Sequence, residues 1–173
     1  MKQKLFKIIP FVSIAFAVIA IALLFIPKSF CGFQGAYNSD YWFSGLEVFF
    51  RSNSYFNNNP SLGLGGSVSA AGIITLVLLV LSIVGNVFAN KNSALKMLAA
   101  ILTILSAVML LAMQLWMIIL YPTKTPVVLW GPYIGGVLTL ASGGITLWAS
   151  IEMLIEEKNA IVNNTKTYSY LKK

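Results

Sequence analysis

Four long stretches without a charged residue constrain this 173-residue chain more than any other feature of its sequence. They hold 20, 39, 27 and 27 residues, and they lie between Lys7 and Lys28, Arg51 and Lys91, Lys96 and Lys124, and Lys124 and Glu152. A helix needs about 20 apolar residues to cross a bilayer core about 30 Å thick. The pattern therefore predicts an all-α membrane protein with four transmembrane helices, at residues 8–26, 69–89, 97–121 and 130–151. Pro10 would fall in the first turn of the first helix, where its missing N–H is tolerated.

The composition agrees with a protein whose core is formed by helices packed in lipid. Hydrophobic residues make up 58% of the chain and charged residues only 10%, whereas soluble domains carry about 25% charged residues. No segment is long and polar enough to form a separate soluble domain. We therefore expect one integral membrane domain over residues 1–173, with a long connection at 27–68 and a polar tail at 156–173.

The basic residues predict how the chain is oriented. Cytoplasmic segments of membrane proteins carry an excess of Lys and Arg. Three basic residues, Lys28, Arg51 and Lys124, flank one side of the predicted spans. Nine flank the other side, namely Lys2, Lys4, Lys7, Lys91, Lys96, Lys158, Lys166, Lys172 and Lys173. This predicts a multi-pass protein of the plasma membrane with cytoplasmic N- and C-termini and an external 27–68 loop. The basic tail either lies near anionic lipid headgroups or is a solvated end.

Several kinds of chemistry lack the residues that they need. The chain has no His and one Cys, which excludes an intrachain disulfide and the usual Cys/His zinc site. The middle of each predicted span holds no Asp, Glu, Lys or Arg, the groups that mark proton-coupled transporters and charge-selective pores. There is no carboxylate pair at depth and no activated serine pattern. We expect no enzymatic activity, no metal or cofactor, and no nucleic-acid partner.

Two kinds of residue inside the predicted spans indicate helix packing. Asn86 and Gln114 are the polar side chains that are most costly to place in a membrane, and each is expected to hydrogen-bond a neighbouring helix. The fourth span carries small residues, which let helix backbones approach closely in lipid. Gly131 and Gly135 are spaced as GxxxG, and Gly136 and Gly143 lie on a face with Thr139, Thr146 and Ser150, which Gly144 would widen.

An aromatic stretch, DYWFSGLEVFF at 40–50, lies outside the predicted spans. As a helix it would place five large side chains on one face: Trp42, Phe43, Leu46, Phe49 and Phe50. Ser39 or Asp40 would cap its start, and Glu47 and Arg51 would form an i,i+4 pair. A small β element is the alternative, with Gly45 at a bulge or turn. In either form the stretch would be a docking surface or a lid on the helix ends.

The topology and this stretch together resemble the claudin-type tetraspan proteins. The shared features are four spans, cytoplasmic ends, a larger first external loop and the W-x-x-G-L element from Trp42 to Leu46. The family signature is W-G-L-W followed by two loop cysteines. This chain spaces the motif more widely, has Glu47 where the last Trp belongs, and lacks both cysteines. The resemblance implies an external sheet that binds a partner, whereas the richness in Asn, Lys and Ile is typical of an AT-rich bacterial genome.

These observations lead to two functional hypotheses. The first is a non-enzymatic subunit that supports the assembly of, or contacts within, a larger membrane complex. Its partner would be another membrane protein or further copies of the chain within the lipid bilayer. The second is a small-solute channel or transporter formed by oligomerisation.

Overall fold

The computed structural model describes residues 2–34, 40–50, 70–89, 92–120 and 126–170. Within these residues the chain is mostly helical, and four of its helices are long and apolar enough to cross a membrane. They are α1 (Lys2–Phe25), α4 (Ala70–Phe88), α5 (Ser93–Leu111) and α7 (Trp130–Tyr170). The prediction of four membrane-spanning helices in a mostly helical protein therefore agrees with the structure at this level.

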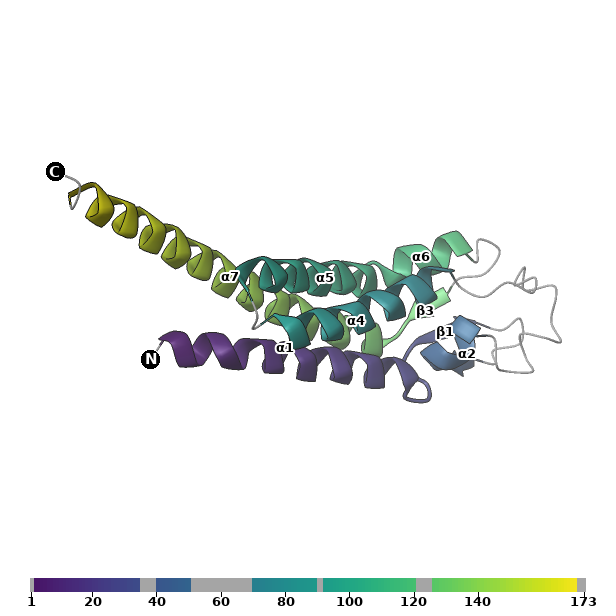
Figure 1. Cartoon of the computed structure of the whole chain (residues 1–173). Coiled ribbons are helices and arrows are strands. Elements are labelled where there is room, and N and C mark those ends of the chain that lie inside the picture. Colours follow the sequence, from purple (N-terminus) through teal and green to yellow (C-terminus); the bar gives the residue numbers. More distant parts are fainter. Residues whose placement is uncertain (1, 35–39, 51–69, 90–91, 121–125, 171–173) are drawn as a thin grey trace.

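The four long helices lie side by side in one bundle (Figure 1). α1 packs on α4 and α7, and α5 packs on the same two helices, so α1 and α5 lie diagonally across the bundle. Figure 1 shows both chain termini at one end of the bundle and the short elements at the other. We call these the terminal end and the sheet end.

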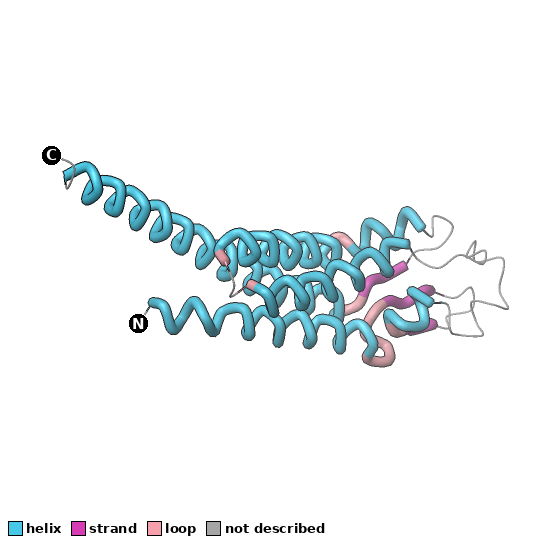
Figure 2. The backbone as a smooth tube through the Cα atoms, in the orientation of Figure 1, coloured by secondary structure: helices cyan, strands magenta, loops and turns pink. Residues whose placement is uncertain are grey.

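Three helix boundaries differ from the prediction. α1 begins at Lys2 rather than at residue 8, so Pro10 lies inside the helix and not in its first turn. The third span is interrupted at Ala112 and continues as α6 (Met113–Leu120). α7 runs on to Tyr170, so the predicted tail is helical over its described part. A 41-residue helix is about 60 Å long, twice the thickness of a bilayer core. Figure 2 shows its last turns projecting beyond the bundle.

A small antiparallel sheet shows that the fold is not purely α-helical. Its strands are β1 (Cys31–Gln34), β2 (Asp40–Phe43) and β3 (Pro126–Val128), in the order β2-β1-β3. Cys31 pairs with Phe43 on one side and with Val128 on the other. The sheet therefore joins the segments that follow α1 and precede α7, which lie far apart in the sequence.

Among the described residues the core has two parts, one at each end of the bundle. The larger part, at the sheet end, brings together buried residues of the helices, the sheet and the short helix α2 (Gly45–Phe50); Leu24, Phe30, Phe49, Leu79, Leu110 and Met117 are among them. The smaller part contains Phe6, Ile9 and Ala149, with Met153 packed against them. α1 is therefore held by apolar contacts at both of its ends.

Candidate interaction surface

The stretch at 40–50 is half strand and half helix. Residues 40–43 form β2, and residues 45–50 form α2. Ser44 begins α2 with a capping box: its N–H donates to Oε2 of Glu47 at 2.7 Å, and the Glu47 N–H donates to Ser44 Oγ at 3.4 Å. The prediction of one helix over the whole stretch is wrong, because pairing with β1 holds its first half extended. The predicted cap at Asp40 is wrong for the same reason. Ser39, and Arg51 of the predicted Glu47–Arg51 pair, lie outside the described residues. The S-x-x-E pattern at 44–47 is visible in the sequence.

We call the three strands and α2 together the end layer, and part of it is buried. Phe43 is only 3% exposed and faces the core from the sheet, beside its strand neighbours Cys31 and Val128. Phe49 is fully buried, and its ring meets that of Phe30 edge-on, with the centroids 4.8 Å apart. The prediction that Phe43 and Phe49 share one face with Trp42, Leu46 and Phe50 is therefore wrong, because the first two are buried and the other three are exposed. Both side chains anchor the end layer to the bundle.

The other side of the end layer carries exposed apolar side chains. Trp42 projects from the opposite face of the sheet and covers Gly32, where an added Cβ would lie 2.5 Å from the indole ring. Val127 pairs with Gly32 from the other side, so it shares this face. On α2, Leu46 and Phe50 are exposed and one helical turn apart. The four side chains are between 41% and 55% exposed, and we call Trp42, Leu46, Phe50 and Val127 the apolar end surface.

The base under this surface is closely packed. A Cβ added at Gly45 would lie 2.7 Å from the carbonyl oxygen of Leu24, so the start of α2 lies directly against the end of α1. Cys31 lies in the same base. Its burial, and to a smaller degree the charge of Glu47, raises the pKa of the thiol well above its ordinary value. A thiol held in this way is unreactive, because only the thiolate is a good nucleophile.

The two polar residues of the predicted spans have different roles. Asn86 joins α4 to α5 through an Nδ2 bond of 3.3 Å to Thr103 Oγ1, and it also donates to its own helix at the Ser82 carbonyl. Its buried Oδ1 has no hydrogen-bond partner. Gln114, in α6, accepts a 2.8 Å bond from the backbone N–H of Val128. This bond joins α6 to the strand β3, and the expectation that Gln114 also hydrogen-bonds a neighbouring helix stays a prediction.

The four predicted packing glycines of α7 are all buried and lie against other elements. A Cβ added at Gly131 would lie within 3.2 Å of Ser29, and one added at Gly135 would lie 3.2 Å from Ala20. A Cβ added at Gly136 would lie 2.8 Å from Leu111. At Gly143 the added atom would lie 2.8 Å from Ile104 Cγ1. The first two glycines thus face α1 and the turn that follows it, and the last two face α5.

Sequence reasoning missed the environment of Lys96. The charge pattern suggested a loop lysine, whereas the structure places it in the first turn of α5 with 1% of its surface exposed. α5 begins earlier than predicted because Asn92 caps it, accepting a 2.7 Å bond from the Leu95 N–H. In the same turn of α5, Ser93 Oγ donates a 2.8 Å hydrogen bond to Oε2 of Glu157 in α7.

In the part of the chain that the structure describes, no group of three His, Cys, Asp or Glu side chains could hold a metal ion. Comparison with models of known protein families and with curated proteins gives no match for this chain.

Proposed function

We propose that this chain is a non-enzymatic subunit of a larger membrane complex and that it binds its partner through the apolar end surface. The observation that carries the proposal is the two-sided end layer. Phe43 and Phe49 fasten the layer to the bundle, so Trp42, Leu46 and Phe50 are not needed to hold it there. Apolar side chains that stay exposed on a fixed base are typical of contact sites, and aromatic residues dominate binding energy in such sites.

The proposal includes a location and an orientation. The chain would lie in the plasma membrane with both termini in the cytoplasm, because nine basic residues lie on the terminal side of the predicted spans against three on the other. The apolar end surface would then face outward, near the lipid headgroups, where Trp residues are favoured. The basic end of α7 would lie near anionic headgroups on the inner side.

The polar side chains inside the bundle support a role in protein contacts better than a role in transport. Most buried hydroxyls donate to a carbonyl of their own helix, as Thr75, Thr103 and Thr139 do at 2.8 Å. Hydroxyls satisfied in this way need no water or solute as a partner. A relationship to the claudin-type proteins would agree with an external binding sheet, and it stays a prediction.

Co-purification from mild detergent tests the proposal. We expect the chain to bring a larger partner in fixed stoichiometry, and the triple change Trp42→Ser, Leu46→Ser and Phe50→Ser to lower that recovery at least tenfold. The matched control removes three apolar side chains that are equally exposed on α4, through Ile74→Ser, Val77→Ser and Leu81→Ser, and should keep the partner.

Two results would contradict the proposal. A homo-oligomer without another protein would favour the channel hypothesis. Unchanged partner recovery together with a less stable chain would show that the end layer is only a lid on its own bundle.

A further inference from the structure

Pro10 leaves a backbone carbonyl of α1 without its usual donor. In an α-helix each N–H donates to the carbonyl four residues earlier, and proline has no N–H. Pro10 lies inside α1, so the carbonyl oxygen of Phe6 does not receive this bond. The proline ring also pushes against that carbonyl, which bends a helix and turns the oxygen outward. A buried carbonyl of this kind needs a donor from elsewhere in the protein.

Lys96 supplies that donor from the far side of the bundle. Its Nζ donates to the Phe6 oxygen at 2.8 Å and contacts Met153 Sδ of α7 at 3.2 Å. The ammonium also lies 5.9 Å from the centre of the Phe6 ring. One side chain of α5 therefore reaches both α1 and α7. No carboxylate is among the contacts that the structure gives it, so the carbonyl is its closest polar partner.

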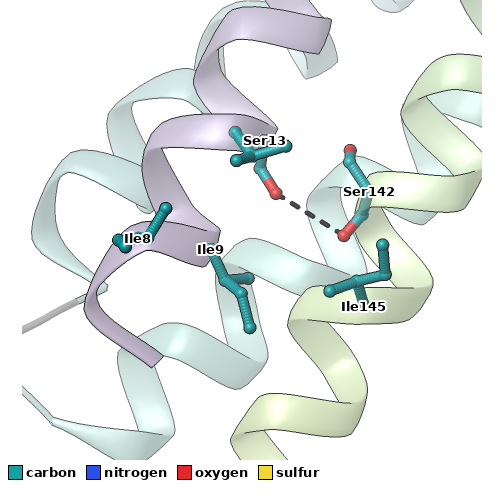
Figure 3. Close-up of a pocket in the computed structure, with 6 residues that line it drawn as sticks. Ile8, Ile9, Ser13, Ser142 and Ile145 are labelled. Carbon is teal, nitrogen blue, oxygen red and sulfur yellow. Dashed lines mark hydrogen bonds between the residues drawn. The ribbon is translucent and has the colours of Figure 1, made fainter. Parts of the chain in front are cut away.

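The turns of α1 on either side of Pro10 border a pocket. This partly open pocket has a volume of about 200 Å³ and lies between α1 and α7; it is lined by Ile8, Ile9, Val12 and Ser13 of α1 and by Ser142 and Ile145 of α7. Ser13 also joins the two helices through a 2.7 Å hydrogen bond to Thr146 Oγ1. Figure 3 shows Ser13 facing Ser142 at the same level. On the N-terminal side of Pro10, the ring of Phe6 lies edge-on to that of Trp148.

We propose that Pro10 and Lys96 form a hinge and a latch at the terminal end of the bundle. Pro10 is the hinge about which the segment Lys2–Ile9 can change its angle, with Ser13 and Thr146 as the fixed point above it. Lys96 is the latch, because its bond to Phe6 holds that segment against α5 and α7. The partly open pocket beside the hinge leaves unfilled space next to Ile8 and Ile9.

A double-mutant cycle on the full chain tests this inference, because the proline and the lysine act through the same carbonyl. Pro10→Ala restores the missing N–H, and Lys96→Met removes the ammonium while keeping a long apolar side chain. In the natural chain, Lys96→Met should lower the folded-to-unfolded ratio in mixed micelles about tenfold, the cost of an unsatisfied buried carbonyl. In the Pro10→Ala background, the same change should lower the ratio less than about threefold, since the carbonyl then has its helical partner. Lys7→Met, which removes an exposed ammonium from α1, is the matched control and should give no such coupling.

Hydrogen exchange distinguishes a latch from general stabilisation. In Lys96→Met, the amides of residues 7–9 should exchange about tenfold faster while those in the middle of α5 and α7 stay protected. If Lys96→Met fails to fold, recovery of folding by Pro10→Ala supports the latch, and failure of the double variant overturns it. Equal costs in both backgrounds, or unchanged exchange at residues 7–9, would also overturn it.

Discussion

At the scale of single residues, two adjacent glycines of α7 have opposite surroundings. A Cβ added at Gly143 would lie 2.8 Å from Ile104 Cγ1 and 3.2 Å from the Ile104 backbone nitrogen. A Cβ added at Gly144 would have no atom within 4 Å outside its own helix segment. The small-residue face that the sequence shows is therefore a real contact with α5 at Gly143, whereas Gly144 adds nothing to it.

This pair allows a controlled test of helix packing. Gly143→Leu should destabilise the bundle by about 1–3 kcal/mol, because the larger side chain is driven into α5. Gly144→Leu should change stability by less than about 0.5 kcal/mol, since the site is open. Unfolding of both variants in mixed micelles measures the difference. Equal stability of the two would show that the close approach at Gly143 does not contribute.

At the scale of elements, the short strand β3 depends on α6. The N–H of Val128 donates its hydrogen bond to the side-chain oxygen of Gln114 rather than to a neighbouring strand. On the β1 side, the backbone carbonyl of Phe30 accepts a 2.8 Å hydrogen bond from the Leu129 N–H. The backbone at this end of β3 therefore has hydrogen-bond partners on both sides. An edge strand whose N–H groups are occupied is protected from pairing with other chains.

Substitution of Gln114 tests this arrangement. Gln114→Leu should leave the Val128 N–H without an acceptor, at a cost of about 1–3 kcal/mol, and should speed exchange of the Val128 amide. Gln114→Glu keeps an acceptor oxygen at the same position and should retain most of the protection. Hydrogen exchange resolved at Val128 gives the answer, and similar exchange in the two variants would argue against the side-chain bond.

At the scale of the whole molecule, both termini lie at one end of the bundle and the sheet lies at the other (Figure 1). If the four long helices cross a membrane in this arrangement, both termini lie on the same side of it. The charge pattern predicts that this side is the cytoplasm.

Cysteine labelling of intact cells tests this orientation. The background is a Cys31→Ala variant, which removes the single native thiol. A membrane-impermeant maleimide should label Asp40→Cys, at the start of β2, and should not label Thr165→Cys, near the end of α7. Permeabilisation should make both react, which controls for access. The reverse pattern in intact cells would place the apolar end surface in the cytoplasm.

The number and type of the long helices followed from the sequence alone. Hydropathy over 20 residues is a local property, and a membrane-length apolar run has few alternatives to a helix. The glycines that contact neighbouring helices were also visible, because their spacing reflects the period of a single helix. The starts of helices were less predictable. Asn92 and Ser44 cap two of them, and the sequence has many similar polar residues that could have served as caps instead.

Only the tertiary structure decided which large side chains are buried at the sheet end. Phe49 and Phe50 are adjacent aromatic residues, yet one is fully buried and the other is 47% exposed. The difference arises because β1 pairs with the nearby β2 and with the distant β3, and this pairing sets which face meets the bundle. The position of Lys96 had the same origin. Its partner carbonyl lies 90 residues away in the sequence and is free only because Pro10, in another helix, lacks an N–H, so no local pattern around Lys96 could have shown it.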